Sequence, residues 1–140
     1  ACAARRLPFY AALNVTGRER FSPPHPADAL VARGFRRDQA RDKGFGGASL
    51  GPQAPAALAE AFAAHGYAIH RAPSDWVVDR RARAFTRAIA DGHATAALGW
   101  ERRGADAILD WLDTRQDQAD AGQLAVRIGH QDFLALPPAR

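Results

Sequence analysis

The stretch Leu7-Pro8-Phe9-Tyr10-Ala11-Ala12-Leu13-Asn14-Val15 decides the predicted fold. It is a short, continuous apolar run that stops at Thr16-Gly17-Arg18. Such a run is typical of a strand buried on both faces, and strands of this kind belong mainly to parallel sheets that helices cover. Pro8 is compatible with a strand only near its first residue, where the missing N–H does no harm. The run therefore predicts an α/β fold.

The remainder of the chain alternates between helical and strand patterns. Apolar residues at three- and four-residue spacing predict helices, and alternating polarity predicts strands. The predicted helices start near Pro26, span Pro55 to His65, span about Arg80 to Leu98 and span about Ala105 to Ala121; the further strands span Tyr67 to Ala72 and Leu124 to Leu136. No linker interrupts this order, so residues 1–140 are predicted to form one domain.

The charge of the chain raises the question of a nucleic-acid partner. The formal net charge is +4, and nearly all of the basic residues are arginines, with Lys43 as the only lysine. These arginines are spread among Asp and Glu along the sequence instead of forming one stripe. A solvated surface is the simpler interpretation, so the sequence argues against nucleic acid as a partner.

Composition also bears on the compartment. No apolar stretch approaches the roughly 20 residues of a membrane-spanning helix. The single cysteine, Cys2, excludes an internal disulfide framework and favours a reducing cytoplasm. The chain contains no methionine, and its opening resembles the end of a helix. We therefore expect Ala1 not to be the native N-terminus.

Several segments together resemble the C-terminal half of class I (Rossmann-like) S-adenosylmethionine-dependent methyltransferases. The residues FYAALNVTGR at 9–18 resemble the fifth strand of that family. Asp42-Lys43-Gly44-Phe45-Gly46, with Phe21-Ser22-Pro23 through Asp28 before it and Leu50-Gly51-Pro52 after it, resembles an insertion found after that strand in one bacterial subgroup. His65–Trp76 and Val126–Leu136 are similar to the segments of the sixth and seventh strands.

The resemblance implies a particular strand arrangement, and it implies that the cofactor is bound by a different part of the full-length protein. Three strands would form the C-terminal part of a Rossmann-like sheet, with the last strand antiparallel and inserted between the other two and with helices packed on it. In the family, a glycine-rich turn after the first strand and an acidic residue after the second hold S-adenosylmethionine. Neither precedes Leu7, and the glycines at 44–51 follow a helix instead of a strand. The full-length protein would thus use S-adenosylmethionine, whereas this chain alone would bind no cofactor and be inactive.

The resemblance also implies a cap over a small-molecule methyl acceptor, at about residues 18–52. Its candidate substrate-binding residues are Arg18, Phe21, Arg37, Gln39, Asp42, Lys43 and Phe45. The basic side chains would pair with an anionic group of the acceptor, and the two phenylalanines would shield methyl transfer from water. In the alternative interpretation, Asp42 and Lys43 form an ion pair at a helix end and the phenylalanines belong to the core. No catalytic residue stands out.

Other ionisable residues give no site. The five histidines are scattered without the spacing of metal ligands, and the aspartates at 106–120 are typical of a solvated helix face. No metal site is therefore predicted. An unpaired edge of the strand at 7–15 would be a template for pairing, so we expect self-association through that edge.

A competing function comes from a different class. The chain could be a stand-alone small basic interaction module that binds nucleic acid through its arginines. That hypothesis explains the basic composition without assuming an N-terminal half of the protein that binds the cofactor. It requires the arginines to gather on one face, and it requires affinity to fall steeply with salt.

Overall fold

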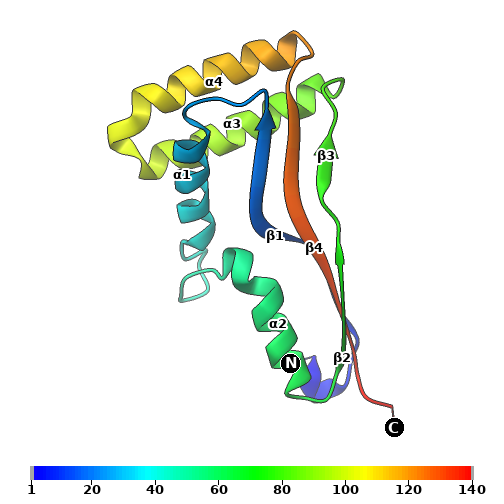
Figure 1. The fold of residues 1–140 in the computed structure, drawn as a ribbon. Helices are drawn as coiled ribbons and strands as arrows, with labels where there is room; N and C mark the ends of the chain where they lie inside the picture. Colours follow the sequence, from blue (N-terminus) through cyan, green and yellow to red (C-terminus); the bar gives the residue numbers. More distant parts are fainter. Residues whose placement is uncertain (1, 140) are drawn as a thin grey trace. The chain divides into compact units, whose positions relative to one another are not determined.

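The computed structural model describes residues 2–139, which form helices and an open antiparallel sheet of four strands (Figure 1). The strands are β1 (Phe9–Ser22), β2 (Ala68–Pro73), β3 (Trp76–Val78) and β4 (Ala125–Leu136), and the helices are α1 (Asp28–Ala40), α2 (Ala54–Ala63), α3 (Arg83–Trp100) and α4 (Ala105–Asp120). Short 3-10 turns occur at Ala3–Arg5, Gly51–Gln53 and Arg102–Gly104. The prediction of an α/β fold is confirmed, and all four helices lie within a few residues of their predicted positions.

The chain divides into two compact units. The first unit comprises Ala1–Arg18, Leu50–Asp75 and Gly129–Arg140, and the second comprises Glu19–Ser49 and Trp76–Ile128. The long strands β1 and β4 each contribute one part to either unit. Each unit has a hydrophobic core of its own, and each is described separately.

In the first unit, β4 lies between β1 and β2. The pairing of β2 with β4 is antiparallel, with Ala68 opposite Leu136 and Pro73 opposite Gln131. Helix α2 packs against β2, and the core consists of Phe62, Tyr67, Phe133 and Ala135. The ring of Phe9 stacks on that of Phe62 with 5.0 Å between centroids, which joins β1 to this core.

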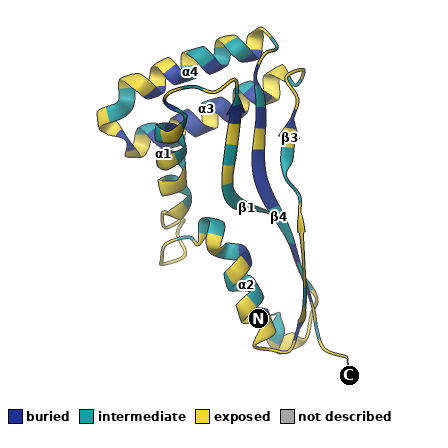
Figure 2. Ribbon diagram, in the orientation of Figure 1, coloured by how far each residue is buried: buried dark blue, intermediate teal, exposed yellow. Residues whose placement is uncertain are grey.

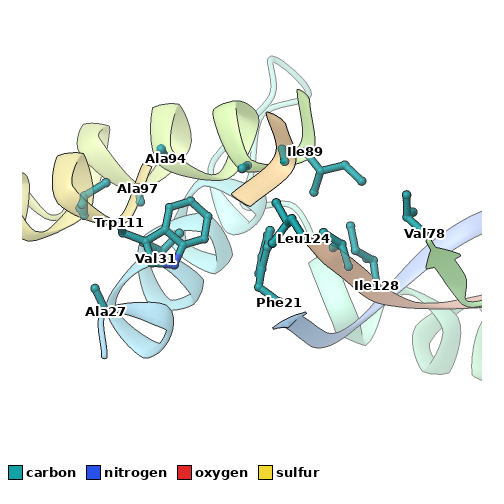
Figure 3. Close-up of a cluster of buried hydrophobic side chains, with 14 residues drawn as sticks. Phe21, Ala27, Val31, Val78, Ile89, Ala94, Ala97, Trp111, Leu124 and Ile128 are labelled. Atoms are coloured by element: carbon teal, nitrogen blue, oxygen red, sulfur yellow. The ribbon is translucent and has the colours of Figure 1, made fainter. Parts of the chain in front are cut away.

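In the second unit, α3 packs against both α1 and α4 (Figure 1). Figure 3 shows the core between these helices and the sheet, with Phe21, Trp111 and Leu124 among its large side chains. Gly34 on α1 faces Ala97 on α3 so closely that a Cβ at residue 34 would lie 2.6 Å from the Cα of Ala97. The helices cross at this point because glycine leaves room for backbone to approach backbone.

Two predictions about β1 are wrong. The strand is not buried on both faces: its residues are mostly exposed or half-buried, whereas β4 is buried along much of its length (Figure 2). The strand also continues to Ser22, beyond the predicted end at Val15. The exposure has a physical reason: β1 is the last strand in the order of an antiparallel sheet, and such sheets commonly keep one face in water.

The sheet itself differs from the prediction of three strands. It has a fourth strand, β3, which pairs antiparallel with β4 and places Val77 opposite Arg127. The strand order of the whole sheet is therefore not the predicted one. The sequence around Trp76–Val78 suggested only a loop or a strand extension, because three residues are too few to show alternation.

Within residues 2–139, no helix is long and apolar enough to cross a membrane.

Candidate functional site

The seven residues predicted to bind substrate are divided between the two units. Arg18 belongs to the first unit, on β1. The others belong to the second unit: Phe21 ends β1, Arg37 and Gln39 lie near the end of α1, and Asp42, Lys43 and Phe45 lie in the loop that follows. The loop of residues 41–49 is called the 41–49 loop below.

Phe21 packs in the core of the second unit. It is buried, and its ring packs edge-on against His93 and Trp111, with centroids 5.1 and 5.0 Å away. The guanidinium of Arg115 lies 5.5 Å from the centre of the same ring. This packing agrees with the alternative interpretation, in which the phenylalanine belongs to the core, and the role of Phe21 at a methyl acceptor stays a prediction.

Arg18 and Arg37 each have a carboxylate partner within their own unit. Nη2 of Arg18 lies 3.6 Å from Oδ1 of Asp75. Nη1 of Arg37 donates to Oε1 of Glu101 over 2.9 Å, and Arg33 binds both oxygens of that carboxylate. The hydrogen bond from Arg33 lowers the pKa of Glu101 below its ordinary value, with both arginine charges contributing.

Gln39 lies between Arg37 and the loop and carries a buried amide oxygen. Its Oε1 accepts no hydrogen bond within the described residues. An unsatisfied amide oxygen weakens the local packing. No ligand is assigned to Gln39, because the side chain belongs to the inner side of α1.

Asp42 organises the 41–49 loop through its own backbone. Its Oδ1 accepts the N–H of Gly44 over 2.8 Å and the N–H of Phe45 over 3.0 Å. These bonds, led by the one from Gly44, lower the pKa of the carboxyl below its ordinary value. A backbone bridge between Asp42 and Ala48 closes the loop. The carboxylate of Asp42 is thus a loop-forming acceptor instead of the partner of Lys43.

The tip of the loop presents an aromatic ring to solvent. Phe45 is 94% exposed, and Lys43 beside it is exposed as well. Gly44 and Gly46 have φ angles of 92° and 80°, a conformation that glycine adopts without strain. The loop therefore holds Phe45 and Lys43 outward, where the ring can stack and the ammonium can bind an anion. A phenyl ring and an ammonium group can hold a ligand in place, so the loop suits binding and positioning.

Sequence reasoning missed the neighbours of this loop. Oδ1 of Asp38 accepts a hydrogen bond from Nε of Arg41 over 2.9 Å and one from Nε1 of Trp100 over 3.5 Å. Trp100, at the end of α3, is therefore close to the start of the loop, and its ring remains partly exposed. The helical spacing of α1 could have grouped the arginines, but only the packing of α1 on α3 brings Trp100 to them.

A second polar cluster, buried in the second unit, serves the fold. Nε2 of His93 lies 3.1 Å from Oε2 of Glu19. Arg115 donates to Oδ1 of Asp28 over 2.6 Å, and Trp111 donates to the same oxygen over 2.7 Å. These groups bind one another, so the cluster is a structural network between β1 and the helices.

The described residues offer no fit for S-adenosylmethionine. The glycines of the 41–49 loop follow helix α1, and the N–H groups of Gly44 and Phe45 already donate to Asp42. A nucleotide-binding turn instead follows a strand and keeps its N–H groups for the ligand. No group of three or more His, Cys, Asp or Glu side chains in residues 2–139 could hold a metal ion.

Comparisons of the chain with protein-family models, with curated proteins and with solved structures found no match. The interpretation of the site therefore depends on its own geometry.

Proposed function

We propose that this chain is the C-terminal, acceptor-side portion of a Rossmann-like S-adenosylmethionine-dependent methyltransferase. In this proposal the 41–49 loop contacts the methyl acceptor. The cofactor belongs to the part of the full-length protein that precedes these residues, so no chemical step is assigned to S-adenosylmethionine here.

One observation carries the proposal, namely the position of β4 in the first unit. The chain runs from β1 through helices to β2, and through further helices to β4, which then lies between β1 and β2 and antiparallel to β2. The resemblance to this methyltransferase family implies a last strand inserted between two earlier ones, and the place of β4 between β1 and β2 supports that part of the proposal, although β3 also pairs with β4 and the sheet as a whole is not the predicted one. Few small α/β folds need such a return, because sequential strands are usually neighbours.

The end of β1 supports the acceptor-side role. Ligands of open, mostly parallel α/β sheets bind outside the carboxyl ends of the strands, and the proposal takes β1 to be one of the parallel strands of such a sheet in the full-length protein. β1 ends at Ser22, and the chain then forms α1 and the 41–49 loop before it returns to the sheet. Four of the predicted residues of this segment are exposed; Arg37 binds Glu101 and Asp42 binds the loop backbone, so the proposal assigns the acceptor to Lys43 and Phe45. They can hold an acceptor in a fixed orientation, and orientation supplies much of the rate of a transfer between two bound molecules.

The experiment uses the protein expressed with the coding sequence that precedes Ala1. We expect it to bind S-adenosylmethionine in a calorimetric titration and to transfer a radiolabelled methyl group to acceptors in a cell extract. The change Phe45→Ala should lower methyl transfer and leave the Kd for S-adenosylmethionine unchanged. The matched control is Val77→Ala on β3, whose side chain is 73% exposed in the same unit.

Two results would contradict the proposal. The first is that no S-adenosylmethionine binds to the longer protein. The second is that Phe45→Ala and Val77→Ala transfer methyl groups equally well, which would remove the loop from the acceptor site.

A further inference from the structure

The second unit carries a surface on which basic and aromatic side chains lie together. It follows the exposed side of α1, the 41–49 loop and the turn after α3. Its members are Arg33, Arg36, Arg37, Arg41, Lys43, Phe45, Trp100, Arg102 and Arg103. We call it the basic aromatic surface.

Contacts within the unit join these residues. Arg33 and Arg37 both bind Glu101, and Arg102 and Arg103 directly follow that glutamate in the chain. Trp100, which precedes Glu101, shares the carboxylate of Asp38 with Arg41. These contacts place the end of α3 beside the last two turns of α1, from which the chain enters the loop.

The charge of the surface is clearly positive. Seven basic side chains stand against the carboxylates of Asp38, Asp42 and Glu101, which leaves a net charge of +4. The three carboxylates are occupied by Arg41, by the backbone of the loop and by the pair Arg33 and Arg37. Arg36, Lys43, Arg102 and Arg103 make no ion pair within the described residues, so they are available to an anionic partner.

The aromatic side chains are placed among these charges. Phe45 projects from the loop beside Lys43. Trp100 is close to Arg41 because both donate a hydrogen bond to Asp38. The backbone of the loop is bonded to Asp42, and the ring of Phe45 is almost fully in water, where its face is open to a stacking partner. Interleaved cations and aromatic rings bind single-stranded nucleic acid, because phosphates pair with the cations and every base has a face that can stack.

We infer that the basic aromatic surface binds single-stranded nucleic acid, with a base stacked on Phe45 and the backbone held by the arginines. Arginine is well suited to this role because its planar guanidinium binds phosphate in a bidentate manner and stacks on bases. The inference concerns binding alone and does not depend on the proposed methyl transfer. The sequence argued against nucleic acid because its arginines are spread among Asp and Glu, but the fold brings the arginines of α1 close to those that follow α3.

A lipid surface fits these observations less well. A helix that lies in a membrane interface needs a free apolar face. The apolar side of α1, with Val31 and Gly34, is buried against α3. The apolar part of the surface thus consists of separate rings, which suits separate bases.

The test measures the fluorescence anisotropy of a labelled, mixed-sequence RNA of about 12 nucleotides, a length within the usual site sizes, as the chain is added. We expect Phe45→Ala to raise the Kd roughly 5- to 150-fold, because one stacked base is lost. Phe45→Tyr keeps a stacking ring and should bind like the wild type. Lys43→Gln and Arg36→Gln should each lower the slope of log Kd against log salt by about 0.7.

Matched controls separate the surface from general effects. Val77→Ala removes apolar area from another exposed strand position, and Arg81→Gln removes one exposed charge beyond β3. Both should leave the Kd and the salt slope unchanged. The inference is overturned if Phe45→Ala binds as tightly as Val77→Ala, or if Lys43→Gln and Arg36→Gln match Arg81→Gln. It is also overturned if the chain binds phosphatidylserine vesicles and not the RNA. None of these results depends on methyl transfer.

Discussion

Gly34 sets the distance between α1 and α3 in the second unit. A Cβ at this residue would lie 2.6 Å from the Cα and 2.8 Å from the Cβ of Ala97. Both atoms belong to or adjoin the backbone of α3, so they cannot turn aside. We expect Gly34→Ala to lower the free energy of unfolding by about 1–3 kcal/mol, the usual cost of overpacking, measured by urea denaturation.

The control for this substitution is Gly92→Ala, which is also in a helix. Nothing lies within 4 Å of a Cβ at residue 92. Alanine favours the helix, so this variant should gain up to about 1 kcal/mol. If both variants shift the urea midpoint in the same direction, the close approach at Gly34 does not limit the packing.

Asp42 gives the 41–49 loop a dependence on pH. Its pKa lies below the ordinary value of 3.8 because the N–H groups of Gly44 and Phe45, among others, bind the ionised form. The contribution of Asp42 to stability is therefore present above its unfolded pKa and is lost as the pH falls through its lower, folded pKa. We expect the amide resonances of Gly44 and Phe45 to titrate together, with a midpoint below 3.8.

The control is the variant Asp42→Asn, whose side chain accepts a hydrogen bond but does not ionise in this range. Its amides at 44 and 45 should show no such step. A midpoint at or above the ordinary value in the wild type would mean that the carboxylate does not bind the loop backbone in solution.

At single positions, the sequence predicted the loop better than the strand. The glycines around Phe45 indicated a loop, but the two interpretations of Phe45 itself were a shield over the methyl acceptor and a core residue. In the structure Phe45 is 94% exposed. Phe21 has the same side chain but is buried. Its environment depends on which face of β1 packs on the helices, and a one-residue shift in a strand reverses that face. Residue type alone could not separate the two phenylalanines.

At the scale of elements, a buried pair of ionisable groups joins β1 to α3. The side chains of Glu19 and His93 are 6% and 4% exposed, and their nearest atoms are 3.1 Å apart. We expect His93→Leu to lower the free energy of unfolding by about 3–5 kcal/mol, because it leaves the carboxylate of Glu19 buried without this partner. Guanidinium denaturation measures the loss.

The double variant Glu19→Leu with His93→Leu tests the reason for the loss. An apolar pair of similar size removes the unpaired charge, so the double variant should be more stable than His93→Leu alone. Additive losses in this cycle would show that packing, and not the unpaired carboxylate, accounts for the effect.

The helices were predictable because their apolar spacing repeats over many residues. α3 and α4 show it over 18 and 16 residues, respectively. The strands were harder to predict for physical reasons. β3 has three residues, and the length of β1 is fixed by its neighbour β4 instead of by its own composition. The ends of such strands depend on pairing with strands that are far away in the sequence, so the local residue pattern does not predict them.

At the scale of the whole molecule, the different sizes of the two cores lead us to expect that the two units differ in stability. Among residues 2–139, the core of the second unit has fourteen buried hydrophobic residues, and that of the first unit has four. Because stability rises with buried apolar area, we expect the first unit to open at a lower denaturant concentration. In hydrogen exchange at low denaturant, amides of α2 and β2 should lose protection before those of α3 and α4.

The aromatic residues provide an independent readout of this order. The three tryptophans, at 76, 100 and 111, are in the second unit, and the two tyrosines, at 10 and 67, are in the first. Phe62→Ala weakens only the smaller core, so it should shift the tyrosine transition further than the tryptophan transition. Coincident transitions in every variant would show one cooperative fold.

The edge of β1 predicts association between copies. β1 is a terminal strand of the sheet, and Tyr10 and Leu13 are exposed on it. Such an edge pairs readily with another chain. Leu13 also adopts a φ of 57°, which asparagine tolerates better than leucine. We expect the wild-type chain to self-associate in sedimentation velocity as its concentration rises, and Leu13→Asn to remain monomeric at least as stably folded. Leu109→Asn, at a leucine 47% exposed on α4, is the matched control and should associate like the wild type. If all three proteins are monomers at high concentration, the edge of β1 is protected, and its exposed leucine has no role in association.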